Sequence, residues 1–199
     1  NYLIYWGSSA LTAGRYHFDF TMAFDREVPL LPVFVWFYIL AFPFWAVGYL
    51  LAARRGKDMF YRFVAPDLTI HFICFICFIL IPTTNIRPEI PGNTLSEKIL
   101  ALVYSLDGGN SPSNLFPSIH CYVSWMCWKG VEGSEKVPKW YQRFSLVFAI
   151  LIIISTQVLK QHYIVDAAAA LLLVEFFWRF YQKGQRHKWV VHVFAHKKK

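Results

Sequence analysis

The sequence predicts an all-α protein: a polytopic membrane helix bundle of five to six transmembrane helices, with six favoured, in a single domain over residues 1–199. Hydrophobic residues make up 56% of the chain and aromatic residues 19%, whereas charged residues make up only 16%. A soluble domain usually has roughly 25% charged residues to cover its surface. The apolar residues also gather in runs, and a run of about 17–25 residues is long enough to cross a bilayer.

Six apolar runs are the candidate spans: residues 2–13, 33–53, 68–84, 116–130, 144–159 and 163–182. The second and the sixth have the length of a full span, and the third is shorter but almost wholly apolar. The fourth and the fifth are shorter again. The first run has only 12 residues, so it is either the end of a first span or an interfacial helix.

The segment between the third and fourth runs, residues 85–115, opens and closes with turn-forming Pro, Gly and Asn residues. Within it, residues 95–106 have apolar side chains at helical spacing, and Ser96 is a suitable helix start. We therefore expect an interfacial helix there. Tyr104 is the only aromatic residue of the segment, which predicts a loose cover over this side of the bundle.

Basic residues concentrate in residues 54–62, 129–143 and 179–199, which hold most of the 20 Lys and Arg residues. The positive-inside rule places these segments and the C-terminus in the cytoplasm, and residues 85–115 on the non-cytoplasmic side. The net charge of +8 would also suit a nucleic-acid-binding protein. Because the basic residues form short clusters between apolar runs, we expect membrane lipids as partners and no nucleic acid.

Ionisable residues inside membrane spans are costly and are therefore candidates for function. His120, Lys160, His162 and Asp166 lie near the non-cytoplasmic ends of the predicted spans, and Arg87 lies on the same side. His162 and Asp166 are spaced i, i+4, which places them on one face of a helix. A carboxylate on Nδ1 leaves Nε2 as the more basic nitrogen, as a nucleophile or a general base requires. A purely structural His–Asp pair is an equally good reading of these two residues alone.

The segment from Phe116 to His120 predicts a helix start, with Pro117 in the first turn. The unpaired N–H groups of that turn and the Ser118 hydroxyl would form an anion site, although an ordinary Pro-initiated helix has the same pattern. Arg87 adds a planar cation suited to phosphate oxygens. Together these groups predict a site for a phosphate ester. The carboxylates on this side show no compact metal-ligand spacing, so we expect neither a metal nor another cofactor.

These residues fall into three ordered motifs that resemble those of the type-2 phosphatidic acid phosphatase superfamily, which comprises integral membrane lipid phosphatases and phosphotransferases. The family motifs are K-x6-R-P, P-S-x-H and S-R-x5-H-x3-D. In this chain they read Arg87-Pro88, Pro117-Ser118-Ile119-His120 and Ser155-Thr156-x5-His162-x3-Asp166. The resemblance covers about residues 68–181 and implies a six-helix bundle.

Two positions depart from the family pattern. Leu80 stands where the first motif has lysine, and Thr156 stands where the third has arginine. Both positions contact phosphate in the family, so the phosphate-binding site is expected to be rearranged. Lys160, two residues before His162, is a candidate replacement for one lost cation.

The resemblance implies that His162 attacks phosphorus and forms a phosphohistidine, with Asp166 orienting the ring. His120 would protonate the leaving alkoxide and then activate the acceptor, while Arg87, Ser118 and Lys160 bind the phosphate. We expect a membrane lipid phosphate phosphatase that hydrolyses a phosphomonoester lipid on the non-cytoplasmic face. The alternatives are a phosphotransferase of the same fold that moves a phospho-headgroup to a lipid or polyol alcohol, as sphingolipid synthases do, and a non-catalytic lipid-binding protein.

Overall fold

The computed structural model describes residues 2–109 and 112–195. Its elements are α1 (Tyr2–Thr12), β1 (Phe18–Asp19), α2 (Ala23–Glu27), η1 (Pro32–Phe34), α3 (Val35–Arg54), α4 (Lys57–Leu80), β2 (Thr83–Thr84), α5 (Leu95–Leu106), α6 (Ile119–Val131), α7 (Lys139–Val158), α8 (Ile164–Gln182) and α9 (Lys188–Ala195). Strands β1 and β2 form one short parallel pair, and the other elements are helices. The predicted all-α class is confirmed.

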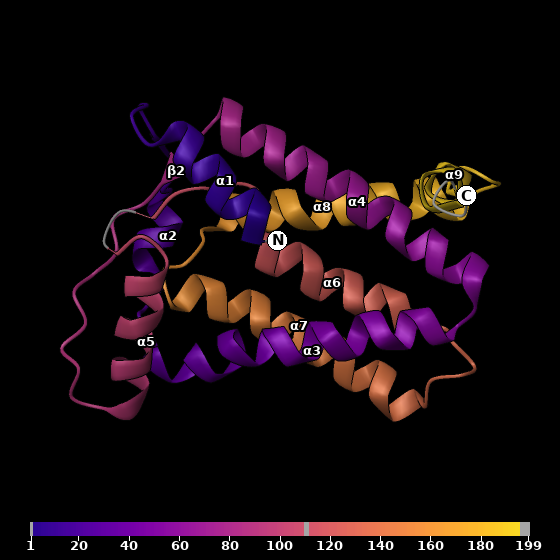
Figure 1. The fold of residues 1–199 in the computed structure, drawn as a ribbon. Helices are drawn as coiled ribbons and strands as arrows, with labels where there is room; N and C mark the ends of the chain where they lie inside the picture. Colours follow the sequence, from indigo (N-terminus) through magenta and orange to yellow (C-terminus); the bar gives the residue numbers. More distant parts are fainter. Residues whose placement is uncertain (1, 110–111, 196–199) are drawn as a thin grey trace.

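Helix α6 is the centre of the bundle and packs against α3, α7 and α8 (Figure 1). Two glycines allow close approaches of α6 to α3 and to α4. A Cβ atom added to Gly48 of α3 would lie 2.6 Å from the Cys127 sulfur, and one added to Gly130 would lie 2.8 Å from the Phe63 ring. Small residues therefore set the spacing between the helices, as is common in membrane bundles.

A buried polar network also joins three helices of the bundle. Tyr49 of α3 donates a hydrogen bond to the Asp67 carboxylate of α4 (2.8 Å), and His71 Nδ1 lies 3.4 Å from the same oxygen. The Tyr122 hydroxyl of α6 contacts His71 Nε2 at 2.6 Å. Such side-chain contacts hold apolar helices in one register where lipid supplies no hydrophobic driving force between them.

Three helical stretches among the described residues are long and apolar enough to cross a membrane: Pro32–Arg54, Lys57–Leu80 and Lys139–Val158. Two further predicted spans, residues 116–130 and 163–182, form α6 and α8 in the same bundle. The run at residues 2–13 forms α1. The total of five to six crossings, and the side on which each terminus lies, stay predictions.

The helices differ from the apolar runs mainly at their polar ends. Helix α4 begins at Lys57 rather than at residue 68, so the basic loop expected at residues 54–62 shrinks to a turn at Arg55 and Gly56. Gly56 makes this turn with a φ of 113°, a conformation that favours glycine. Helix α7 begins at Lys139 rather than at residue 144, and helix α9 forms within the expected basic tail. Residues 197–199 of that tail lie outside the described residues.

Helix α5 has the predicted range, but Thr94 caps it rather than Ser96. The Thr94 hydroxyl accepts a hydrogen bond from the Glu97 N–H (3.2 Å), and the Glu97 carboxylate accepts one from the Thr94 N–H (3.1 Å). Leu100 and Tyr104 are buried against Val35 and Tyr38 of α3. Within the cover over this end of the bundle, residues 95–106 are therefore a packed helix and not the loose segment that the composition predicts.

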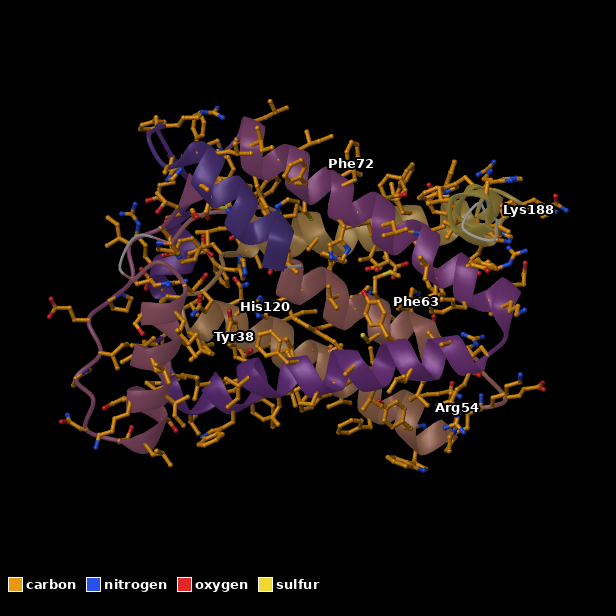
Figure 2. All side chains as sticks on the ribbon, in the orientation of Figure 1. Tyr38, Arg54, Phe63, Phe72, His120 and Lys188 are labelled. Atoms are coloured by element: carbon orange, nitrogen blue, oxygen red, sulfur yellow. The ribbon has the colours of Figure 1, made fainter. Side chains whose placement is uncertain are left out.

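Helices α5 and α9 lie at opposite ends of the bundle (Figure 1). Figure 2 shows His120 toward the α5 end and Arg54 and Lys188 toward the α9 end. The candidate site and these two basic residues are thus separated along the length of the bundle.

Candidate active site

The candidate nucleophile pair is in contact, because His162 Nδ1 lies 3.5 Å from an Asp166 carboxylate oxygen. Asp166 lies in the first turn of α8, where the same oxygen accepts a hydrogen bond from the Tyr163 N–H (2.9 Å). His162 precedes α8, and the N–H groups of His162 and Gln161 both donate to the Thr156 carbonyl (3.0 and 2.9 Å). The expected contact therefore forms, but between a turn residue, His162, and a residue of the helix cap, Asp166. The two residues do not share one face of a helix as the sequence predicted.

His120 lies in the first turn of α6, beside this pair. Ser118 caps the helix, since its hydroxyl accepts a hydrogen bond from the Cys121 N–H (3.3 Å). Pro117 precedes the cap, whereas the sequence predicted it in the first turn. The Ser118 N–H donates to the Asp166 carbonyl (3.2 Å) and so joins the beginnings of α6 and α8. This arrangement brings the ring centroids of His120 and His162 to 6.0 Å.

Aromatic side chains of α3 enclose the His120 ring. Tyr38 stacks on it with centroids 4.3 Å apart, Trp45 lies at 5.1 Å, and Phe42 lies at 5.9 Å. These rings limit the approach of water to His120 and hold its orientation. Sequence analysis missed them because they belong to a long apolar run with no polar residue to mark the side that faces the site.

Arg87 is fully buried and clamps the end of α5 to the segment before His162. Its guanidinium donates to the carbonyls of Asp107 (3.0 Å) and Gly109 (3.1 Å), to the Asp107 carboxylate (2.5 Å) and to the Gln161 side-chain oxygen. It also lies 4.6 Å from the centre of the Tyr104 ring. Four of the five N–H donors of this side chain are therefore used within the protein, and Nε is the fifth.

The ammonium of Lys160 lies elsewhere, on the backbone of the α2 segment. It donates to the carbonyls of Asp25 (2.6 Å) and Val28 (2.5 Å). Burial lowers the pKa of Lys160, and the nearby Asp25 carboxylate opposes that shift. We therefore assign Lys160 to the attachment of α2, not to the replacement of a lost phosphate-binding cation. The two motif positions that carry cations in the family hold Leu80, which is 64% exposed, and Thr156, which is buried. Neither residue restores the lost positive charge.

Several buried polar atoms around the two histidines have no hydrogen-bond partner within the described part of the chain. They are Asn85 Oδ1, Arg87 Nε, His120 Nε2, Gln161 Nε2 and His162 Nδ1. His162 Nδ1 lies 3.5 Å from the Asp166 carboxylate, an ion-pair contact rather than a hydrogen bond. Sequence analysis did not single out Gln161 or Asn85. The position of Gln161 directly before His162 was the one available signal for that residue.

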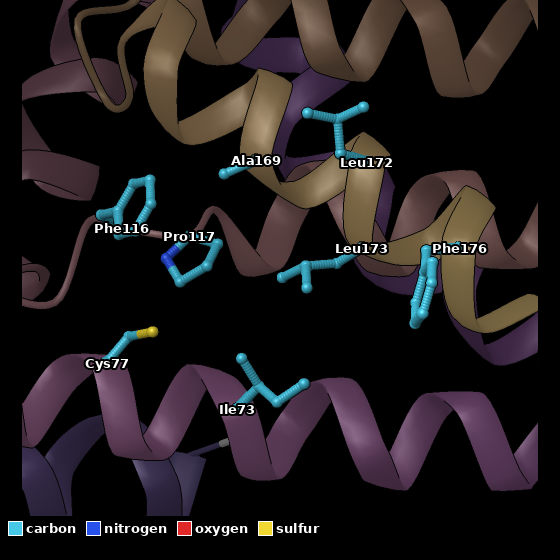
Figure 3. Close-up of a pocket in the computed structure, with 8 residues that line it drawn as sticks. All are labelled: Ile73, Cys77, Phe116, Pro117, Ala169, Leu172, Leu173 and Phe176. Atoms are coloured by element: carbon cyan, nitrogen blue, oxygen red, sulfur yellow. The ribbon is translucent and has the colours of Figure 1, made fainter.

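An apolar groove of about 410 Å³ runs between α4 and α8 (Figure 3). Its lining residues are Ile73, Cys77, Phe116, Pro117, Ala169, Leu172, Leu173 and Phe176. Phe116 and Pro117 directly precede Ser118, so one end of the groove adjoins the start of α6. Leu172 and Phe176 are 71% and 62% exposed, so the groove opens on the outer surface of the bundle.

Within residues 2–109 and 112–195, no three His, Cys, Asp or Glu side chains are grouped to hold a metal ion. The candidate site offers two imidazoles, one carboxylate and one guanidinium. Comparisons with curated proteins and with solved structures gave no significant match. The family model of the PAP2 superfamily matches residues 14–179, a range that includes every candidate site residue. The chain therefore belongs to the PAP2 superfamily, whose members are generally phosphatases.

Proposed function

We propose that this protein is an integral membrane lipid phosphate phosphatase that works through a phosphohistidine at His162. The observation that carries the proposal is the contact of His162 Nδ1 with Asp166 at 3.5 Å, with the His120 ring 6.0 Å from the His162 ring. This contact leaves Nε2 of His162 as the nucleophilic nitrogen. A second imidazole beside it supplies the acid and base that phosphoryl transfer through histidine requires.

In the first step, His162 Nε2 bonds to phosphorus as the phosphorus–oxygen bond to the lipid breaks. His120 gives its proton to the leaving alkoxide, which departs as an alcohol, and Asp166 stabilises the positive charge on His162. In the second step, His120 takes a proton from water, the water oxygen bonds to phosphorus, and the phosphorus–nitrogen bond breaks. Inorganic phosphate leaves, and both histidines return to their starting states.

Positive charge for the phosphate comes from Arg87, whose Nε points to no partner among the described residues. The N–H groups at the start of α6, capped by Ser118, add partial positive charge beside His120. These groups stabilise the oxygens of the transition state without a metal ion. Activity should therefore persist in excess chelator.

The groove between α4 and α8 supports a lipid as the substrate. Its lining is apolar, and Phe116 and Pro117 connect it to the capped start of α6. An alkyl chain in the groove would place the phosphate of the same molecule beside Ser118 and His120. A small water-soluble phosphate ester would leave this surface unused.

A phosphotransferase is the second candidate, and two observations favour it. Tyr38, Phe42 and Trp45 enclose His120, and α5 is packed rather than loose over this end of the bundle. Exclusion of water protects a phosphohistidine until an alcohol accepts the phosphoryl group. The two candidates differ in the acceptor but share the same nucleophile.

The test uses the purified protein with a phosphomonoester lipid alone, and then with a headgroup-bearing phospholipid and an acceptor alcohol. We expect free phosphate from the first mixture and no headgroup transfer in the second. His162→Ala should lose activity by several orders of magnitude, whereas His192→Ala, an exposed histidine on α9, should not. Headgroup transfer without phosphate release would favour the transferase. More than a few per cent of activity in His162→Ala would refute the nucleophile.

A further inference from the structure

We infer that Gln161 binds the substrate phosphate, with its side-chain Nε2 donating to a non-bridging oxygen in place of the arginine that Thr156 replaces. The inference rests on the proposed function, because it assigns a residue to the same site. Gln161 is 1% exposed and lies between Lys160 and His162. Its backbone N–H donates to the Thr156 carbonyl, so the turn that positions His162 positions Gln161 as well.

Arg87 fixes which atom of the Gln161 carboxamide is available. A guanidinium donates hydrogen bonds and accepts none, so the atom that it contacts must be the carboxamide oxygen. The nitrogen is then the other end of the group and offers two N–H donors. Gln161 Nε2 is buried and has no partner in the part of the chain that the structure describes.

Gln161 Nε2 forms a connected group with two further such nitrogens, besides His162 Nδ1, which faces the Asp166 carboxylate at 3.5 Å. Arg87, which is hydrogen-bonded to Gln161, has an unpartnered Nε, and His120, next to His162, has an unpartnered Nε2. Buried polar groups without partners are rare in proteins, and each one calls for an explanation. A phosphate group supplies three non-bridging oxygens that accept hydrogen bonds, which is the complement of this group of donors.

The departures from the family motifs explain why an amide is needed here. Thr156 uses its hydroxyl on the Ile153 carbonyl (2.8 Å), Leu80 is exposed, and Lys160 is bound to the α2 segment. Arg87 is then the single cation left of those the motifs provide, and four of its donors are already used. Gln161 adds two neutral donors at the position next to the nucleophile.

Gln161→Glu separates a phosphate-binding role from a merely structural one. The variant keeps the shape of the side chain and the oxygen that accepts from Arg87, but it replaces the two N–H donors with a carboxylate oxygen. If Gln161 only anchors Arg87, the variant keeps full activity. If Gln161 donates to phosphate, kcat/KM should fall by about 10²–10³-fold, as for the loss of one oxyanion donor. The matched control is Gln157→Glu, the same change at a half-buried residue four positions earlier.

A second readout does not depend on turnover. Inorganic phosphate should raise the Tm of the detergent-solubilised wild type and of Gln157→Glu, but not that of Gln161→Glu. The Gln161→Glu activity relative to the wild type should also recover as the pH falls, because a protonated carboxyl offers an O–H donor. Gln161→Met, which has similar size and no N–H, should lose the phosphate effect as well and serves if the glutamate variant does not fold.

The outcomes distinguish this inference from the proposed function. If the wild type hydrolyses the lipid phosphate and Gln161→Glu retains both activity and the phosphate-dependent Tm, Gln161 is structural and the inference is wrong. The proposed phosphatase then stands. If the wild type shows neither hydrolysis nor stabilisation by inorganic phosphate, the proposed function fails and the inference fails with it.

Discussion

His162 is positioned by backbone contacts on one side and by a carboxylate on the other. The i, i+4 spacing to Asp166 was sufficient to predict their contact, because a capped turn brings the same two residues together as a helix would. The roles of Lys160 and Gln161 could not be predicted in this way. Its positive charge alone made Lys160 a candidate for phosphate binding. Lys160 lies in a turn with a φ of 52°, and the sequence does not determine where the side chains of such a turn point.

Removal of the charge on Asp166 should reduce turnover more than binding. Asp166→Asn keeps an oxygen that can accept from the Tyr163 N–H, so α8 stays capped, but it no longer stabilises a positive His162 ring. We expect kcat on a lipid phosphomonoester to fall by at least about 10²-fold with a much smaller change in KM. Glu89→Gln, at an exposed carboxylate, is the control. A rise in KM with unchanged kcat would contradict the orienting role.

At the scale of elements, the apolar runs located the helices but not their ends. Helices α4 and α7 extend beyond the apolar runs, because charged residues also form regular helix where water can reach them. The length of an apolar run therefore indicates the part of a helix that lies in the hydrocarbon layer, not the whole helix. The range of α5 was predicted correctly, but its cap was not, since both Thr94 and Ser96 are suitable caps. Glu97, three residues after Thr94, completes the capping box that decides between them.

The docking of α5 depends on side chains that face α3. Leu100 is fully buried, so Leu100→Ala should weaken the packing of α5 by about 2–5 kcal/mol. Leu102, which is 57% exposed on the same helix, gives the matched control Leu102→Ala. We expect faster amide hydrogen exchange across residues 95–106 in the first variant only. Equal exchange in the two variants would show that the helix is held by the Arg87 clamp alone.

The groove between α4 and α8 leads to a separate prediction about the length of the lipid's alkyl chain. Ala169→Phe fills the groove, so KM should rise about tenfold for a long-chain lipid phosphate, with little change for a short-chain ester. A rise of tenfold corresponds to about 1.4 kcal/mol of lost binding, which is within the range for burial of a few methylene groups. Ala168→Phe, at the exposed neighbouring position, should affect neither substrate. An equal effect on both substrates would indicate damage to the site instead.

For the whole molecule, composition and run length predicted a helical membrane bundle, because these features depend on the solvent rather than on individual contacts. The packing of α5 was not predictable, since it depends on Val35 and Tyr38, which belong to a distant apolar run. The sidedness of the bundle follows from the distribution of basic residues and stays a prediction. The opposite placement of α5 and α9 makes it testable with two positions.

Cysteines that replace Lys98 and Glu135, one in each variant, should be labelled from opposite sides of the membrane. Both residues are exposed, the first on α5 and the second between α6 and α7. Cys74, Cys121 and Cys127 are buried, so only the half-buried Cys77 needs replacement. In intact cells, Lys98→Cys should react with a membrane-impermeant maleimide, and Glu135→Cys should react only after permeabilisation. The reverse pattern would place the candidate site on the cytoplasmic face.

The lateral opening of the α4–α8 groove bears on how the enzyme would meet its substrate. Under the proposed function, a lipid whose chain lies between Ile73 and Leu173 would enter from within the leaflet, and its encounter with the site would be a collision in two dimensions. The quantity that sets occupancy is then the mole fraction of substrate in that leaflet, not its amount per volume of suspension. Dilution of the substrate lipid with an inert lipid should slow the reaction, while dilution of the whole vesicle suspension with buffer should leave the rate per enzyme unchanged.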